Sequence, residues 1–142
     1  MTLCGDQVYI LSGYNVSKQP SNAVYTCSLN ALLQSCTTLQ EMGKIAVWKT
    51  IADLPVTEST CVSLHGQLLA IGGRDSSFKS RSTAAVFKYN LSLKCWEVIS
   101  HMLTPRHLCF AAVMSDNRLI VVGGENSTLL NDSVEVAMIS IH

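Results

Sequence analysis

The chain has 142 residues, of which 48% are hydrophobic and only 14% are charged. Ten basic residues balance ten acidic ones, which excludes the strongly basic surface expected of a protein that binds nucleic acid or anionic lipid. No apolar run approaches the ~18 residues that a membrane-spanning helix needs, and residues 1–6 lack the basic start of a signal peptide. This composition favours one domain built largely from buried sheet.

Residues 1–55 predict a first, incomplete unit of sheet, with strands at residues 7–11, 23–28 and 48–51. The first of these strands follows a turn at Gly5-Asp6 and stops at Ser12-Gly13, and most of an earlier strand is missing. Apolar residues recur at helical spacing after the next strand. We therefore interpret residues 29–46 as an insertion that is either irregular or contains a helical turn.

Residues 56–105 predict one complete unit of four antiparallel strands, at residues 60–64, 67–71, 83–89 and 95–99. His65-Gly66 is typical of a tight hairpin turn, with glycine where a positive φ is needed. The second strand stops at Gly72-Gly73, and the polar residues 74–82 that follow predict a loop.

Residues 106–142 begin the same pattern a third time, with strands predicted at residues 110–114, 118–122 and 133–139. The second of these strands again stops at a double glycine, Gly123-Gly124. No fourth strand and no tryptophan follow in this sequence, so we expect this unit to be truncated. The chain therefore divides into three repeats of one supersecondary unit.

These repeats resemble the kelch repeat, one blade of a β-propeller. The family pattern combines an apolar strand ending in Gly-Gly, a tyrosine shortly before a tryptophan, and Pro-Arg at the start of the next blade. Residues 56–105 match it at Gly72-Gly73, Tyr89 and Trp96, and Pro105-Arg106 follows. The other two repeats match less fully, since Ala137 stands where tyrosine is usual and Ser12 replaces a glycine.

The resemblance implies an all-β chain, a partial kelch-type β-propeller of roughly three four-stranded antiparallel blades in an incomplete ring. It also implies structural roles for the motif residues: glycines where the backbone approaches closely, and aromatic rings between adjacent blades. Propellers close with about 4–8 blades. We therefore expect a fragment or truncated product of a longer protein, which self-associates or stays partly unfolded when expressed alone.

The loops after the double glycines are the predicted protein-contact surface, because corresponding loops of successive blades emerge on one face. The alternative is that they are solvated connectors. The candidate contact residues are Arg74, Asp75, Phe78, Lys79 and Arg81 in one loop, and Glu125, Asn126 and Asn131 in the next.

The sequence predicts no catalytic, cofactor or metal site. Its four histidines share no metal-ligand spacing, and the G-x-S-x-G, G-x-G-x-x-G and P-loop motifs are absent. Six cysteines without a Cys-x-x-Cys pair predict buried free thiols in a reducing, cytoplasmic compartment. Four glycosylation sequons, at Asn15, Asn90, Asn126 and Asn131, point weakly to secretion instead.

We therefore predict a non-catalytic protein-binding module, with no nucleic-acid or membrane partner. The resemblance implies partners of two kinds: targets presented to a cullin-type ubiquitin ligase by propellers joined to a BTB domain, or actin. Two alternatives stay open, a fragment of a catalytic kelch propeller of the copper-radical oxidase type and a fragment of a secreted, glycosylated propeller.

Overall fold

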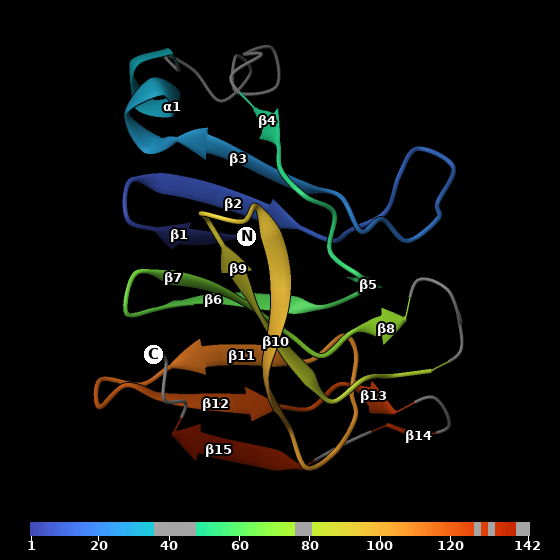
Figure 1. Ribbon diagram of the computed structural model, residues 1–142. Helices are drawn as coiled ribbons and strands as arrows, with labels where there is room; N and C mark the ends of the chain where they lie inside the picture. Colours follow the sequence, from blue (N-terminus) through green and yellow to red (C-terminus); the bar gives the residue numbers. More distant parts are fainter. Residues whose placement is uncertain (36–47, 76–80, 127–128, 131–132, 139–142) are drawn as a thin grey trace.

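The chain folds into antiparallel sheets that fan out from a shared centre (Figure 1). This computed structural model describes residues 1–35, 48–75, 81–126, 129–130 and 133–138. Within these residues, no helix is long and apolar enough to cross a membrane.

The first sheet has the strand order β1-β2-β3-β4. Its strands are β1 (Thr2–Cys4), β2 (Gln7–Leu11), β3 (Val24–Ser28) and the short β4 (Lys49–Thr50). Helix α1 (Leu29–Ser35) follows β3 directly. The predicted insertion therefore begins with two turns of helix, so the helical alternative holds for residues 29–35, and residues 36–47 lie outside the described part.

The second sheet has the strand order β10-β9-β7-β6, the simple meander that the sequence predicts. Its strands are β6 (Thr60–Leu64), β7 (Gln67–Ile71), β9 (Ala85–Asn90) and β10 (Cys95–His101). The turn between β6 and β7 has positive φ at both His65 (51°) and Gly66 (71°), as a tight hairpin requires. A register shift between Val98 and Ser100 marks a bulge in β10.

The described part of the third sheet has three strands, β11 (Phe110–Val113), β12 (Arg118–Val122) and β15 (Val134–Met138). Two small sheets accompany the larger ones: β5 (Val56–Thr57) pairs with β8 (Arg74–Asp75), and β13 (Glu125–Asn126) pairs with β14 (Leu129–Leu130). The prediction of a loop throughout residues 74–82 is therefore wrong at its start, because backbone pairing with β5 holds β8 extended. The boundaries predicted for the three repeats stay a prediction.

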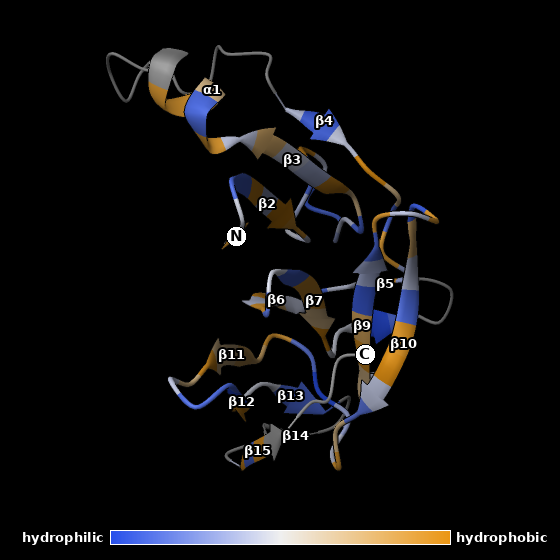
Figure 2. Cartoon of the chain, turned by 60° about the vertical axis from the view of Figure 1, so that its left-hand side comes forward, coloured by the Kyte–Doolittle hydropathy of each residue, from blue (hydrophilic) through white to orange (hydrophobic). Residues whose placement is uncertain are grey.

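The innermost strand β6 lies between β1 and β11, and the other strands of each sheet lead outward from these three. Figures 1 and 2 together show the first sheet above, the third below, and β9 and β10 projecting between them. This arrangement is that of part of a β-propeller. The antiparallel architecture and the partial propeller predicted from the sequence are confirmed.

Strand β7 is buried on both faces, which explains why residues 68–71 are an unbroken apolar run. Side chains alternate along a strand, so Leu68 and Ala70 of β7 pack with the first sheet, in a cluster that includes Tyr9 and Leu11. Leu69 and Ile71 pack on the other side, with residues of the third sheet such as Leu119 and Val121.

The double glycines allow backbone from the next unit to come close. Gly72 has a φ of 63°, and a Cβ placed on it would collide with the carbonyl oxygen of Arg106. Gly73 has a φ of 113° and donates its N–H to the same oxygen at 2.9 Å. The second glycine of each pair also meets backbone of its own unit, since a Cβ would lie 2.6 Å from the carbonyl oxygen of Thr57 at Gly73 and 2.5 Å from that of His107 at Gly124. The predicted structural role of these glycines is confirmed.

The aromatic pair of the second sheet closes its junction with the first. Tyr89 and Trp96 lie side by side with ring centroids 5.2 Å apart. The indole Nε1–H of Trp96 donates to the carbonyl oxygen of Ala52, 2.9 Å away in the segment that leaves the first sheet. As predicted, the rings fill the space between two units and the polar group finds a partner.

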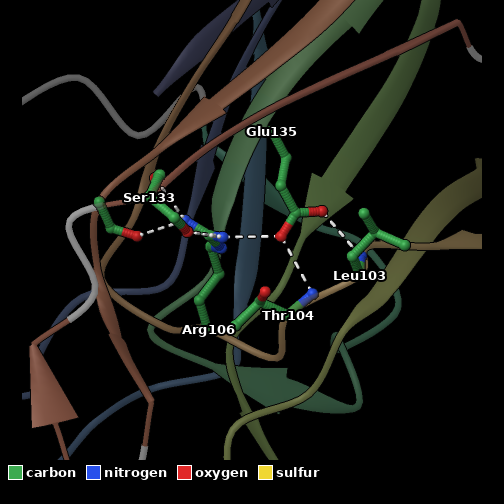
Figure 3. Close-up of polar contacts among 6 residues, drawn as sticks. Leu103, Thr104, Arg106, Ser133 and Glu135 are labelled. Carbon is green, nitrogen blue, oxygen red and sulfur yellow. Dashed lines mark hydrogen bonds and ion pairs between the residues drawn. The ribbon is translucent and has the colours of Figure 1, made fainter.

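An ion pair holds the third sheet to the segment that enters it (Figure 3). The fully buried guanidinium of Arg106 donates to Glu135 Oε1 at 2.7 Å, and also to Ser133 and the carbonyl oxygen of Gly123. The Glu135 carboxylate also accepts the backbone N–H groups of Leu103 and Thr104. Burial alone would raise the pKa of Glu135, but these N–H groups and the guanidinium outweigh it and lower the pKa.

Candidate protein-interaction face

Polar side chains gather on one side of the fan, where the chain leaves the second strand of each unit. Tyr14, Arg74 and Glu125 each follow directly on Ser12-Gly13, Gly72-Gly73 and Gly123-Gly124. Figure 1 shows the loop after β2, the strand β8 and the strands β13 and β14 all at the right-hand side. We call five residues here the polar row: Tyr14, Glu58, Arg74, His107 and Glu125.

Glu58 joins the first two units at the centre of this row. Its side chain is 7% exposed, and its Oε1 accepts a hydrogen bond of 2.6 Å from the hydroxyl of Tyr14. Its Oε2 lies 3.2 Å from Arg74 Nε, an ion pair whose angles do not make a hydrogen bond. The hydrogen bond to the carboxylate raises the pKa of Tyr14, so the phenol stays protonated and donates.

His107 joins the second and third units. It is fully buried, and its Nδ1 lies 2.9 Å from the hydroxyl of Ser82. Its backbone exchanges two hydrogen bonds with Glu125, and its Nε2 lies 3.5 Å from a Glu125 carboxylate oxygen. Burial lowers the pKa of His107, and the nearby Arg74 charge lowers it further against the opposing effect of Glu58 and Glu125.

A hollow of about 310 Å³ opens beside the row, with walls from all three units. Its lining includes Gly13 and Tyr14 of the first unit, Glu58 and Ser59 of the second, and Leu108 of the third. The rim is partly apolar, because Tyr14 is 60% exposed and Leu108 54% exposed, and Val16 is fully exposed two residues after Tyr14 in the same loop. A concave site with a buried carboxylate and exposed apolar side chains suits contact with a polypeptide.

Four of the predicted contact residues lie on this face and are half-buried: Arg74 and Asp75 in β8, and Glu125 and Asn126 in β13. Arg74 and Glu125 belong to the polar row. Arg81 is exposed, and its carbonyl oxygen accepts the N–H of Asp75 at 3.1 Å. Phe78, Lys79 and Asn131 lie outside the described residues, and contact by any of the eight stays a prediction.

Three members of the polar row are absent from the sequence-based set. Tyr14 had a signal, since it follows Ser12-Gly13 at the position that Arg74 and Glu125 hold after the later double glycines. Glu58 and His107 had none of this kind, because they come from the segments that enter each unit. Only pairing of those segments with the residues after the glycines brings them to the row.

Besides the polar row, the structure describes five cysteines and several carboxylates and histidines that could serve as metal ligands. Cys4, Cys61, Cys95 and Cys109 are free thiols, and burial raises the pKa of Cys61 and of Cys109. Among the residues that the structure describes, no three or more His, Cys, Asp or Glu side chains are grouped so that they could hold a metal ion.

Comparison with known proteins gives one positive result. Residues 55–103 match the family model of the Kelch motif, and this segment contains the complete second sheet together with β5 and β8. A search of curated proteins gives no match to the chain. The match supports the kelch-repeat family for this chain, in agreement with the repeats predicted from its sequence.

Proposed function

We propose that this kelch-repeat chain, a partial β-propeller, is a non-catalytic module that binds another protein across the polar row and the adjoining hollow. The observation that supports this most is that residues following the glycines of three successive units come to one side of the fan. Kelch repeats generally mediate contacts between proteins, and loops on a rigid scaffold are suited to that work.

The composition of this face supports a polypeptide partner. Leu108 in the same hollow as Tyr14, and Val16 in the loop that follows Tyr14, offer exposed apolar contact, and the buried Glu58 fixes the Tyr14 hydroxyl in place. Aromatic and arginine side chains are the residues that most often dominate binding energy at protein interfaces. Because Tyr14 and Arg74 are both held by Glu58, their ordering costs little on binding.

Affinity purification with paired variants tests this proposal. The tagged chain, the variants Val16→Glu and Leu108→Asn, and a control variant Leu91→Asn are expressed in the same cells. Leu108 has a φ of 52°, which asparagine tolerates, so this change does not strain the backbone. Leu91 is 70% exposed and lies near Gly66, beside the hairpin turns at the opposite edge of the fan.

The proposal expects proteins that the unchanged chain and Leu91→Asn capture alike, and that both face variants lose. Direct binding of each such protein to the purified chain then gives the affinity. Identical capture by all four forms, or no protein above the tag alone, would overturn it.

A finer assignment, recognition of substrates for a cullin-type ubiquitin ligase, is supported by the family resemblance. Co-expression with a captured partner provides its test, since the partner's ubiquitination should rise with the unchanged chain and not with Val16→Glu. Equal ubiquitination with both would contradict this role, and co-sedimentation with filaments would favour actin instead. Free thiols at Cys4, Cys61, Cys95 and Cys109 support a reducing, cytoplasmic compartment as part of the same proposal.

A further inference from the structure

One loop of the candidate face is an ordered hairpin, residues 13–21, which joins β2 to β3 (Figure 1). At its base, the N–H of Ser21 donates to the carbonyl oxygen of Gly13 at 2.8 Å. The next residues toward the tip, Tyr14 and Pro20, form an antiparallel bridge. We call residues 13–21 the tip hairpin, and its base is fixed to the second unit because Tyr14 donates to a carboxylate of the polar row.

Asn15 organises the tip of this hairpin. Its side-chain Oδ1 accepts the N–H of Ser17 at 3.0 Å and the N–H of Gln19 at 2.9 Å. Its backbone donates to the carbonyl oxygen of Gln19 and accepts the N–H of Lys18, both at 2.9 Å. Asparagine suits such turns because its short side chain reaches the backbone N–H groups of the residues that follow. The sequon at Asn15 therefore has a structural reason of its own, and the tip is ordered before any partner arrives.

Val16 stands at this tip and is fully exposed, so the fold of the chain buries none of its side chain. A single exposed valine carries no implication by itself. This valine, however, directly follows Asn15, at a place where turns favour Asn, Gly and Ser over β-branched residues. Hydrogen bonds on both sides of it hold the backbone in one conformation. The chain therefore presents an apolar group at a fixed position in solvent.

The charge of the tip hairpin favours an acidic partner surface. Lys18 is exposed, and it is the only charged residue among residues 13–21. Glu58, at the base, is 7% exposed and paired with Arg74, so it does not neutralise the Lys18 charge at the surface. A surface that receives the tip is therefore complementary when it carries a carboxylate beside an apolar recess.

We propose that the tip hairpin inserts into a pocket of a folded partner, where an apolar wall receives Val16 and a carboxylate at the rim pairs with Lys18. This inference rests on the protein-binding function proposed above, and it names the element that the chain inserts and the kind of surface that receives it. A loop that is ordered before binding loses little conformational freedom, so even a small contact gives useful affinity. A folded domain is favoured over an extended peptide, because only a folded domain offers an enclosed apolar pocket.

Hydrogen exchange measured by NMR tests the order of the tip in the free chain, without any partner. The amides of Ser17 and Gln19, both bonded to Asn15 Oδ1, should exchange about 10-fold more slowly in the unchanged chain than in the variant Asn15→Ala. Asn15→Asp keeps the accepting oxygen and should keep the protection. Because Asn15 is a positioning residue, rescue by aspartate identifies the accepting oxygen as the group that matters.

Binding is measured with each protein that the unchanged chain captures in the affinity purification above, after that protein has been purified. Val16→Thr keeps the shape of the side chain and replaces one methyl group with a hydroxyl. Burial of that hydroxyl in an apolar pocket should weaken binding by about 10-fold or more. Val98→Thr is the matched control, because it makes the same change at a valine of β10 that is 52% exposed, and it should leave the affinity unchanged.

Two further measurements separate the roles of Asn15 and Lys18. Asn15→Ala should weaken binding about 5-fold through the loss of order, and Asn15→Asp should restore it in about 0.5 M salt, where the added charge is screened. Lys18→Asn suits the φ of 57° at this position and should lower both the affinity and its dependence on salt. Thermal unfolding of each variant verifies that it is folded.

Failure of this inference can be told from failure of the proposed function. Captured proteins that bind the unchanged chain and Val16→Thr equally, but no longer bind Leu108→Asn, would leave the protein-binding face standing and overturn the inserted hairpin. Overlapping synthetic peptides of the partner that bind as tightly as the folded partner would overturn the pocket. Fast exchange of the Ser17 and Gln19 amides in the unchanged chain would overturn the ordered tip, and the absence of any captured protein would overturn both proposals.

Discussion

The two junctions between the sheets share one backbone plan but are closed by opposite chemistry. At the first junction, Val56 enters the second unit and packs in the same apolar cluster as Phe87 of β9. At the second junction, the corresponding positions hold Arg106 and Glu135, whose side chains form a buried ion pair at 2.7 Å. The apolar pair needs only shape, whereas the ionic pair needs every donor and acceptor placed.

This difference shows how a repeated fold tolerates a change of chemistry at one position. The Arg106 side chain is accommodated because Gly123, Ser133 and Glu135 accept hydrogen bonds from it, although its Nε has no hydrogen-bond partner. Removing two charges from water costs several kcal/mol, so such a pair gives little net stability over an apolar one. The buried ion pair does impose a fixed geometry, because one misplaced partner would leave the other charge buried and unpaired.

Breaking the ion pair between Arg106 and Glu135 should lower the free energy of unfolding the most. The variant Glu135→Leu leaves the Arg106 guanidinium buried without its carboxylate, and we expect a loss of about 3–5 kcal/mol in the free energy of unfolding, measured with urea. The double variant Arg106→Val with Glu135→Phe copies the first junction and should recover most of that loss. A double variant no more stable than Glu135→Leu would show that the two junctions are not interchangeable.

At the second junction, adding a methyl group where Gly72 lies against the backbone of Arg106 should cause the next largest loss of stability. Gly72→Ala brings a Cβ into the carbonyl oxygen of Arg106 at a φ of 63°, and we expect a loss of about 3 kcal/mol. Gly66→Ala is the matched control, because Gly66 has a φ of 71° and nothing within 4 Å of the new Cβ. It should lose only about 1 kcal/mol, the cost of the dihedral angle alone. Equal losses would mean that the close approach contributes nothing.

Removing the indole N–H should weaken the first junction by a smaller amount. Trp96→Phe keeps an aromatic ring beside Tyr89 but leaves the carbonyl oxygen of Ala52 without its donor. We expect a loss of about 1.5 kcal/mol in the free energy of unfolding. In hydrogen exchange, the loss of protection should be concentrated in β3 and β9, and an equal loss in β12 would contradict its assignment to the first junction.

Acidification should have the smallest effect, and it should come from the second junction. Since the pKa of His107 is lowered in the folded chain, the unfolded chain binds its proton more readily. Its contribution to stability is complete above the unfolded pKa of about 6.5 and is lost as the pH falls toward the lower folded value. The melting temperature should therefore drop between pH 7.5 and 5.5, and His107→Gln should reduce that slope. An unchanged slope would assign the pH dependence to other groups.

Local signals predicted most of the strands and few of the long-range partners. Alternating apolar residues and Gly-containing turns located β6, β7 and β9 to within two residues. The same signals missed β8, a two-residue strand in a polar segment, because its extended backbone depends on pairing with β5 and with residues 81–82. For the same reason Glu58 and His107 were absent from the predicted site, although Arg74 and Glu125 were included.

By itself, the sequence determined the repeat, the strand order of the complete unit and the positions that must be glycine. Those features depend on side-chain period and on φ, which are properties of a few neighbouring residues. Only the tertiary structure decided which residues meet across the junctions: Glu58 with Tyr14, Arg106 with Glu135, and Trp96 with the backbone of Ala52. These contacts join segments more than 25 residues apart, and packing of whole sheets fixes them.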